Sequence, residues 1–252
     1  MPAISATVIT FNEEKNIGRC LDSLAGVADE IVVVDSYSTD RTAEICSRYD
    51  IRFVQNEFPG HIQQKNFAVS LTSHPLVLSL DADEVLSPEL RSSILHAKEN
   101  WKYDGYYFQR LNNYCGEWIR HTSWYPDFKL RLWDKRKGRW GGLNPHDKVE
   151  MESGSEISRM KGHLEHYSYS SVSEHITRVN RYSDIAARAY HEKGITSGTF
   201  KVIFNPLWKL FREIVVKTGF MQGYYGIVIS VILSFETFLK YVKLKQLQNS
   251  KP

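Results

Sequence analysis

Short apolar runs alternate with longer amphipathic segments along the first hundred residues. The strand-like and helix-like stretches lie in turn at 4–10, 13–24, 30–35, 39–49, 51–56, 60–71, 76–80 and 87–100. This βαβαβαβ order predicts an α/β fold with a mostly parallel sheet flanked by helices. In such a sheet ligands bind beyond the carboxyl ends of the strands, so the residues that end each strand are the first candidates for a site.

The second half of the chain changes pattern twice. Strand-like runs resume at 106–111 and 128–133, and a loop-rich stretch at 139–145 precedes His146 and Asp147. From about residue 170 the apolar residues recur at helical spacing to the end of the chain. We therefore expect a helical appendage after the sheet.

Oxygen ligands stand at the ends of three predicted strands. The run 76–84 (LVLSLDADE) is an apolar strand that stops on carboxylates, among them Asp81 and Asp83, while Thr10 and Asp35 end two earlier strands. Parallel strands present their carboxyl ends at one edge of the sheet, so these side chains should gather there. Mg²⁺ usually takes one or two protein carboxylates and completes its shell from phosphate and water. The pattern therefore favours a divalent cation that carries substrate phosphates.

Composition narrows the class of protein. With 252 residues and 42% hydrophobic content, the chain is large enough to bury a full core. Its three cysteines are widely spaced without metal-ligand or disulfide spacing, which fits a reducing compartment. The first residues lack the basic and apolar parts of a signal peptide, so we expect a cytosolic protein. Neither a GxGxxG after the first strand nor a P-loop motif occurs, which argues against dinucleotide and P-loop enzymes.

The C-terminal segment is basic as well as apolar. Residues 1–198 hold 24 Lys/Arg against 27 Asp/Glu, whereas residues 199–252 hold 8 against 2. Asn205 and Pro206 predict the start of a helix, and the uncharged run 218–235 follows it. At helical spacing, one apolar stripe comprises Phe220, Tyr224, Ile227, Val231, Phe235 and Phe238. A helical hairpin lying on the cytoplasmic face of a membrane fits this pattern. A membrane span, a dimer interface and ordinary core packing remain open.

Four segments together indicate a family by their order and spacing: TVITFNEEKNIGRCLDSL (7–24), EIVVVDSYSTDRTAEI (30–45), QQKNFAV (63–69) and LSLDADEVLSPEL (78–90). With them, the chain resembles the inverting glycosyltransferases of family 2. Within this family it is most similar to the lipopolysaccharide core type that adds glucose to an inner-core heptose. That similarity extends through WYPDFKLRLW (124–133), PHDKVE (145–150) and 163–187. The resemblance implies a GT-A fold, which is a Rossmann-like nucleotide-sugar-binding sheet, and a UDP-linked donor.

The resemblance also implies roles for the residues of the donor half. The base and ribose pocket would be lined by Thr10, Phe11, Asn12 and Glu13. Asp35 would accept a hydrogen bond from the uracil edge, although capping of the following turn explains its position equally well. The residues implied next to the nucleotide are Lys65, Asn66, Asp81 and Ala82.

A divalent cation is the implied cofactor. Asp83 would ligate Mg²⁺ or Mn²⁺ bridging the diphosphate, with Asp81 facing either the ribose or the metal. His166 could complete the metal shell, but a packed or phosphate-facing histidine is an equal alternative. A bound cation is the direct way to stabilise the negative charge that develops on a leaving UDP.

Inverting transfer needs a base that deprotonates the acceptor hydroxyl. Asp147 is the first candidate because it follows His146 after the donor half, where the family type has a His followed by an acidic residue, commonly Glu. Asp127 is the competing candidate, and a turn residue that opens the strand at 128–133 is its simpler interpretation.

These expectations combine into one hypothesis. A GT-A catalytic domain over 1–169, with a donor half at 1–100 and an acceptor half at 101–169, precedes a helical region at 170–252. The protein would be a metal-dependent inverting glycosyltransferase that is peripheral on the cytoplasmic face of the inner membrane. It would move a sugar, glucose or another hexose, from a UDP-sugar to a lipid-linked glycan such as lipopolysaccharide core. A homodimer through the C-terminal helices is possible, and we expect no nucleic-acid partner.

Two rival functions remain at this stage. A sugar-nucleotide pyrophosphorylase would need a glycine-rich, basic loop after the first strand, whereas the residues there are Phe11, Asn12, Glu13 and Glu14. A catalytically silent nucleotide-sugar-binding scaffold would have no need of the carboxylates at 35, 81, 83 and 147.

Overall fold

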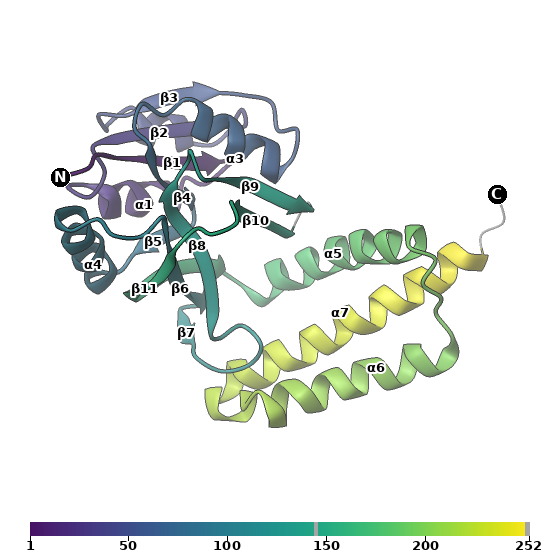
Figure 1. Ribbon diagram of the computed structural model, residues 1–252. Helices are drawn as coiled ribbons and strands as arrows, with labels where there is room; N and C mark the ends of the chain where they lie inside the picture. Colours follow the sequence, from purple (N-terminus) through teal and green to yellow (C-terminus); the bar gives the residue numbers. More distant parts are fainter. Residues whose placement is uncertain (144–145, 250–252) are drawn as a thin grey trace. The chain divides into compact units, whose positions relative to one another are not determined.

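The computed structural model describes residues 1–143 and 146–249, without the side chains of 143 and 146 (Figure 1). The chain forms two compact units. The first unit comprises Met1–Leu111 and Asp127–Tyr167, and the second comprises Asn112–Pro126 and Ser168–Pro252. Each unit is described by itself below.

The first unit begins with alternating strands and helices: β1 (Ile4–Thr10), α1 (Ile17–Leu24), β2 (Glu30–Asp35), α2 (Thr42–Cys46), β3 (Arg52–Gln55), α3 (His61–Ser70) and β4 (Leu76–Asp81). The elements that follow are β5 (Glu84–Leu86), α4 (Pro88–Glu99), β6 (Gly105–Tyr114), β8 (Asp127–Asp134), β9 (Gly138–Leu143), β10 (His146–Met151) and β11 (Ile157–Tyr169). The main sheet has the order β3-β2-β1-β4-β8-β6-β11-β5. Its β3, β2, β1 and β4 pair in parallel, and β8 joins β4 in the antiparallel direction. The predicted α/β fold is confirmed.

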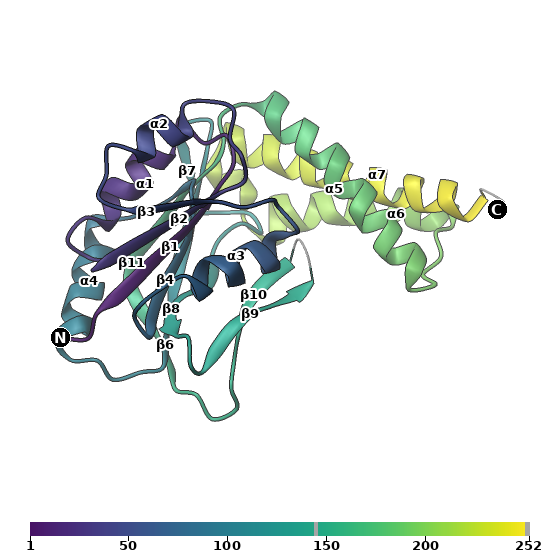
Figure 2. The same ribbon diagram turned by 90° about the horizontal axis from the view of Figure 1, so that it is seen from above.

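The parallel strands are apolar on both faces because helices cover both. In β2, Val33 packs into the core beneath α1 and α4, whereas Val32 and Val34 pack against α3. In β4, Leu78 faces the first layer and Val77 the second. Figure 2 shows α1 and α4 on one side of these strands and α3 on the other. Strands buried on both faces read as continuous apolar runs, which is why the sequence marked them clearly.

Two predicted helices are shorter than expected, for a shared reason. The helix predicted at 13–24 begins at Ile17, and the one predicted at 39–49 is reduced to Thr42–Cys46. The residues before each helix instead bind one another, since the backbone N–H of Asn12 donates to Ser38 Oγ at 2.8 Å. The N–H of Glu14 likewise donates to Asp40 Oδ2 at 3.0 Å. Long-range pairing of two loops thus replaces the first turn of both helices.

The stretch at 139–145, predicted to be rich in loop, is largely a β-hairpin. β9 and β10 pair in the antiparallel direction and bring Asp147 opposite Gly142. The prediction was wrong because Gly141 and Gly142 lie inside a strand; a side chain on Gly141 would collide with the Glu150 side chain. The turn at 144–145, which includes Pro145, lies outside the described residues.

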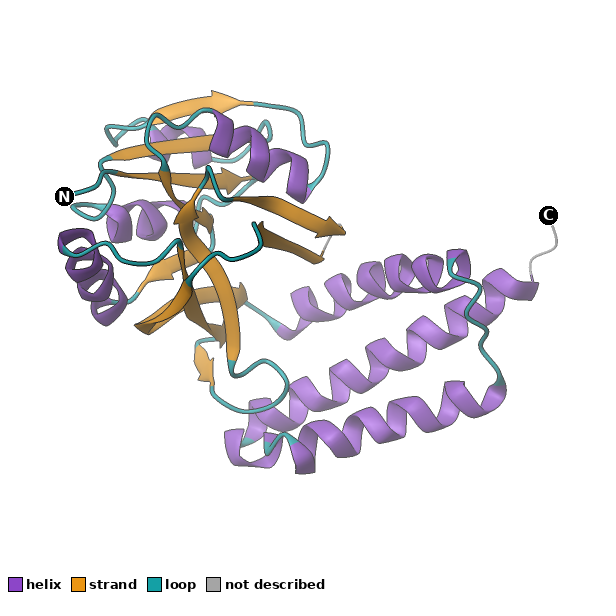
Figure 3. Cartoon of the chain, viewed as in Figure 1, coloured by secondary structure: helices purple, strands orange, loops and turns teal. Residues whose placement is uncertain are grey.

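The second unit is mainly helical. It contains β7 (Glu117–Ile119), α5 (Val172–Glu192), α6 (Thr199–Phe211), a π-helical turn η1 (Arg212–Val216), a 3₁₀ turn η2 (Gly219–Gln222) and α7 (Tyr224–Asn249). α7 packs against both α5 and α6, and the three helices run side by side (Figure 3). Within this unit, the loop before β8 is tied to the turns between α6 and α7. The N–H of Thr122 donates to the Lys217 carbonyl at 2.9 Å, and that of Ser123 to Glu213 at 2.7 Å.

Pro206 lies inside α6, not at its first turn as the sequence predicted. The helix begins at Thr199 and continues through the proline, whose missing N–H ordinarily weakens a helix interior. Packing on α7 compensates, because Pro206 is buried and its carbonyl accepts a hydrogen bond from Ser234 Oγ at 2.8 Å. Within 1–143 and 146–249, no helix has the length and apolar character that a membrane span requires.

Candidate active site

The register of the parallel strands brings the predicted strand-end residues to one edge. Thr10 lies opposite Asp35 between β1 and β2, and Ile9 lies opposite Asp81 between β1 and β4. The structure thus places Thr10, Asp35 and Asp81 at the carboxyl ends of neighbouring strands. This is the edge at which parallel α/β sheets bind ligands.

The loop after β1 is held in place by polar contacts. Asn12 has a left-handed backbone (φ 54°), and its side-chain oxygen accepts a hydrogen bond from the N–H of Thr39 at 2.8 Å. The N–H of Glu13 donates to Thr42 Oγ1 at 2.8 Å, whereas the ring of Phe11 is 56% exposed. A fixed loop with one exposed ring is suited to stack on a planar base.

Asp35 is buried and caps the turn that follows β2. Its Oδ2 accepts hydrogen bonds from the N–H of Ser38 at 2.9 Å and from Gln55 Nε2 at 3.2 Å. The capping role that the sequence allowed is therefore realised. A role towards a nucleotide base stays a prediction.

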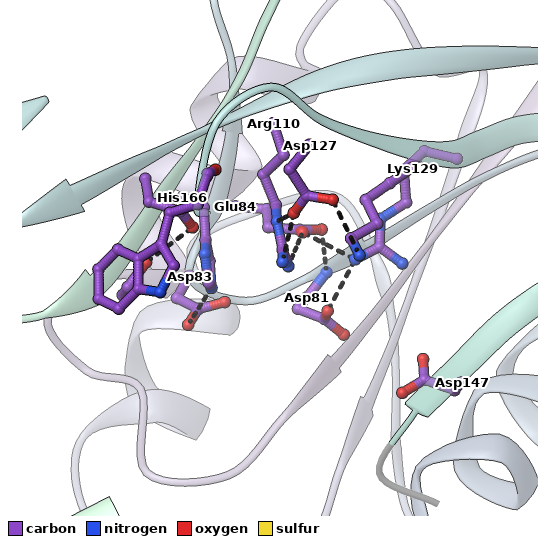
Figure 4. A network of polar contacts seen from close by, with 12 residues as sticks. Asp81, Asp83, Glu84, Arg110, Asp127, Lys129, Asp147 and His166 are labelled. Carbon is purple, nitrogen blue, oxygen red and sulfur yellow. Dashed lines mark hydrogen bonds and ion pairs between the residues drawn. The ribbon is translucent and has the colours of Figure 1, made fainter. Parts of the chain in front are cut away.

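A chain of alternating charges runs through the first unit, and Figure 4 labels Asp127, Arg110, Glu84, Asp81 and Asp147 among its members. From one end to the other it contains Asp127, Arg110, Glu84, Arg131, Asp81, Lys65 and Asp147. Every link from Glu84 onward is short. Arg131 lies 2.7 Å from Glu84 and 3.0 Å from Asp81, and Lys65 lies 2.9 Å from Asp81 and 2.7 Å from Asp147. Glu84, Arg131 and Lys65 are almost fully buried. Buried charges persist only when each has a partner, so these side chains form one mutually dependent set.

Two of these cations determine the protonation of Asp81. Burial by itself would raise its pKa, but the charges of Lys65 and Arg131 outweigh burial and hold the pKa well below its usual range. The carboxylate is therefore ionised and already neutralised by protein groups. Ala82, the next residue, is buried, and its N–H contacts the carbonyl of Ile9.

Lys65 connects the end of β4 to the β9–β10 hairpin. Its ammonium contacts Asp81 and Asp147 together and lies 4.4 Å from the ring centroid of Trp140. Asn66 holds the same hairpin from α3, since its side chain donates to the Trp140 carbonyl at 2.9 Å and accepts from the Trp140 N–H at 3.2 Å. Both residues, predicted to lie near a nucleotide, thus contact the hairpin that carries Asp147.

Asp83 and His166 form a pair at the same end of β4. Strand β11 places His166 opposite Glu84 of β5, and His166 Nε2 lies 3.2 Å from Asp83 Oδ2. The side chains are 15% exposed for Asp83 and 16% exposed for His166. The sequence-predicted candidates Asp83 and His166 are therefore neighbours.

The fit of a divalent cation can be judged from these contacts. Among the described residues, no three His, Cys, Asp or Glu side chains are grouped to hold a metal by themselves. Mg²⁺ with a phosphorylated substrate needs only one or two protein ligands, and carboxylates suit Mg²⁺ and Mn²⁺. Asp83 with His166 beside it fits that requirement. Asp81 is the weaker candidate because Lys65 and Arg131 already engage its oxygens.

Asp127 opens strand β8, as its simpler interpretation expected, and is held by two cations. Arg110 contacts it at 2.7 Å and Lys129 at 3.1 Å. Burial would raise the pKa of Asp127, but Arg110 and Lys129 together lower it. A carboxylate held in its ionised form by two cations is a poor proton acceptor.

Sequence reasoning missed Glu84, Arg110 and Arg131. A signal for Arg131 was present, because Asp127, Lys129 and Arg131 alternate with apolar residues and so share one face of a strand. Charged residues repeated on one strand face in a buried sheet imply partners on neighbouring strands. Glu84 is the last carboxylate of the run 76–84, but no pattern marks Arg110, and the partners of both residues follow only from the structure.

The first unit has the fold of GT-A glycosyltransferases. Residues 5–155 match the family model described as glycosyl transferase family 2, and the chain belongs to this family. It is 31% identical to a lipopolysaccharide core biosynthesis glycosyltransferase, LpsC of Rhizobium meliloti (strain 1021), over 94% of this chain and 91% of the relative. An uncharacterized glycosyltransferase of Rickettsia typhi (strain ATCC VR-144 / Wilmington) is 30% identical over 98% of this chain and 88% of its own. The crystal structure of S. aureus TarS is similar in fold, with a TM-score of 0.50 and 16% identity over 97% of this chain and 54% of that one.

Proposed function

We propose that this family 2 glycosyltransferase is metal-dependent and inverting, and that it moves a hexose such as glucose from a UDP-sugar to a lipid-linked glycan. The observation that carries the proposal is the link through Lys65, which joins the strand-end Asp81 to Asp147 on the hairpin. This link would hold an acceptor base beside a donor-binding edge. The similarity to LpsC supports lipopolysaccharide core as the acceptor class.

The donor would bind at the carboxyl edge of β1, β2 and β4. Phe11 would stack on the uracil, with Thr10, Asn12, Glu13 and Asp35 around the base and ribose. Asp81, kept ionised by Lys65 and Arg131, would accept hydrogen bonds from ribose hydroxyls.

Asp83, with His166 at 3.2 Å, would hold Mg²⁺ or Mn²⁺. When bound, such a cation offsets the negative charge of the departing diphosphate. Lys65 and Arg131 are already balanced by Asp81, Asp147 and Glu84, so a bound cation would supply the positive charge that the diphosphate needs.

Asp147 would take the proton from the acceptor hydroxyl as that oxygen attacks the anomeric carbon from the face opposite the diphosphate. Lys65, at 2.7 Å, would hold the Asp147 carboxylate in position before the acceptor arrives. A single displacement of this kind inverts the anomeric configuration.

The test is an incubation of the purified protein with a panel of nucleotide sugars and extracted glycolipid, with and without Mn²⁺. We expect one donor to add one hexose to the glycolipid, detected as a product mass, and the new linkage to be β when the donor is α-linked. Formation of a sugar nucleotide from a sugar phosphate would instead identify a pyrophosphorylase. Binding of the donor without transfer or hydrolysis would identify a non-catalytic scaffold.

A further inference from the structure

The outer face of α6 is apolar and exposed. Its side chains recur at intervals of three and four residues, with exposed fractions between 48% and 72%: Phe200, Ile203, Phe204, Leu207, Trp208 and Phe211. That spacing defines one stripe along a helix. A helix of a globular unit normally turns such a stripe inward, but here Pro206 is the residue of α6 that is buried.

α7 carries a second exposed stripe beside the first. Tyr224, Ile227, Val231, Phe235 and Phe238 are 39–74% exposed. A shallow apolar groove of about 380 Å³ runs between the two helices and is lined by side chains from both stripes, Ile203 and Leu207 of α6 and Val231, Phe235 and Phe238 of α7 among them. The two stripes therefore lie on one face of the helix pair, which we call the α6–α7 face.

This arrangement removes one interpretation that the sequence left open. Core packing within the chain would bury the stripe from Phe220 to Phe238, yet all six of its members are exposed. Exposed apolar side chains gathered on one face mark a place where something else binds.

Charge distinguishes the remaining occupants. Residues 199–252 hold 8 Lys/Arg against 2 Asp/Glu, and the buried Glu213 is paired with Lys209. Lys201 and Arg212 each follow a member of the α6 stripe, so they lie about 100° around the helix from it, at its margin. A second copy of the chain would bring like charges together across this face, whereas an anionic lipid surface complements them.

We propose that the α6–α7 face lies flat in the headgroup region of an anionic bilayer, with the groove against acyl chains. Aromatic side chains such as Trp208 and Tyr224 suit that boundary, because they present an apolar body and a polar edge. The inference deepens the proposed function and rests on it for its purpose, since the face would hold the enzyme at the surface that carries a lipid-linked acceptor. No membrane span is involved.

The test is co-sedimentation of the full chain with vesicles of phosphatidylcholine alone or mixed with phosphatidylglycerol, without any donor or acceptor. The test variant carries F204Q, L207Q and F235Q on the α6–α7 face. The matched control carries I176Q, Y182Q and I185Q, which replace exposed hydrophobic side chains of α5, 37–46% exposed against 45–60% for the test variant. We expect the wild type and the control to pellet with the mixed vesicles, and the test variant to bind about tenfold or more weakly. Equal unfolding midpoints of the three proteins would exclude misfolding.

A second measurement reports on the face directly. Brominated lipids should quench the tryptophan fluorescence of the wild type more than that of W208F, because Trp208 would reach the acyl boundary. The proposal is overturned if the wild type stays in the supernatant at low salt, or if both triple variants lose binding equally. It is also overturned if the wild type is a detergent-insensitive dimer that the test variant disrupts, which would make the face a contact between copies. Vesicle binding uses no sugar substrate, so failure here leaves sugar transfer intact, and failure of transfer leaves this result intact.

Discussion

The two units of the chain distribute charged and apolar side chains in opposite ways. In the first unit, the side chains of Lys65 and Arg131 are 3% and 4% exposed, and each bridges two carboxylates. In the second unit, Phe200 and Leu207 are 72% and 60% exposed. Each arrangement is costly for a protein that only needs to fold, and the two costs differ in kind. The buried charges create a local electrostatic field, whereas the exposed apolar side chains create a surface that favours binding to another apolar surface.

The difference has energetic consequences. Removing one member of a buried ion network leaves an uncompensated charge, so variants in the first unit should lose stability, activity or both. The exposed side chains of α6 and α7 contribute little to the unfolding free energy, so variants there should lose binding and keep the fold. The following predictions test this difference between the two units.

The largest effect is expected for Asp83→Asn. Loss of the carboxylate next to His166 should lower the rate of transfer by about two orders of magnitude or more, with little change in thermal midpoint, because the strand-end side chain is outside the packed core. The measurement is turnover at saturating donor with Mn²⁺ present. Asp104→Asn, a surface substitution at an aspartate paired with Lys137, is the matched control. Full activity of the wild type in excess chelator would contradict the metal role.

Arg131→Met should lower the free energy of unfolding by about 3–5 kcal/mol, because the fully buried Glu84 would lose its nearest cation and Asp81 would lose one of two. Urea unfolding at neutral pH measures this. The double variant Arg131→Met with Glu84→Gln should recover part of the loss, since one buried charge is removed with its partner. An Arg131→Met protein as stable as the wild type would show that the charge chain is not a mutually dependent set.

His175 offers a smaller test, from the core of the second unit. Burial lowers its pKa from 6.5 to about 4, and its Nδ1 lies 3.1 Å from the Tyr114 hydroxyl. His175 of the unfolded chain therefore binds a proton near pH 6.5, whereas His175 of the folded chain remains neutral until about pH 4. The contribution of neutral His175 to the free energy of unfolding is complete above pH 6.5. It is lost as the pH falls towards 4, by about 1.4 kcal/mol for each pKa unit of the shift.

The check is the urea midpoint of wild type and His175→Phe at pH 7.5 and at pH 5. Carboxylates that titrate in both proteins cancel in the comparison. We expect the wild type to lose more stability than His175→Phe between the two pH values. An identical loss in both proteins would contradict a lowered pKa at His175.

The smallest effect on stability is expected for Leu207→Gln on α6. Its side chain is 60% exposed, so the change in unfolding free energy should stay within about 0.5 kcal/mol. A loss of several kcal/mol would mean that the α6–α7 face supports the fold and is not a free surface.

Much of the first unit could be predicted from sequence because its signals are local. The apolar runs of β1, β2 and β4 and the carboxylates that end them stand in short, contiguous segments. Their gathering at one edge then follows from the rule for parallel sheets. The pairing of Asp83 with His166 was anticipated only as one of two alternatives, since it depends on strand β11 returning beside β5.

The remaining features depend on contacts between distant residues. The cations that neutralise Asp81 come from α3 and β8. No sequence motif around Lys65 or Arg131 indicates that Asp81 is the partner. The segment Asn112–Pro126 joins the helical unit through backbone hydrogen bonds such as Thr122 to Lys217, which leave no trace in sequence patterning. Pro206 misled the helix boundary because its compensation comes from Ser234, 28 residues later.

The most direct test of the proposed chemistry compares Asp147→Asn with Asp127→Asn in the same transfer assay. Both substitutions remove one carboxylate charge, but Asp147 contacts Lys65 at 2.7 Å, whereas Asp127 is held by both Arg110 and Lys129. We expect Asp147→Asn to lower transfer by about 10²–10⁴-fold while donor affinity is retained, and Asp127→Asn to lower it by less than about tenfold. The opposite ranking, with Asp127→Asn inactive and Asp147→Asn active, would contradict the assignment of Asp147 as the base.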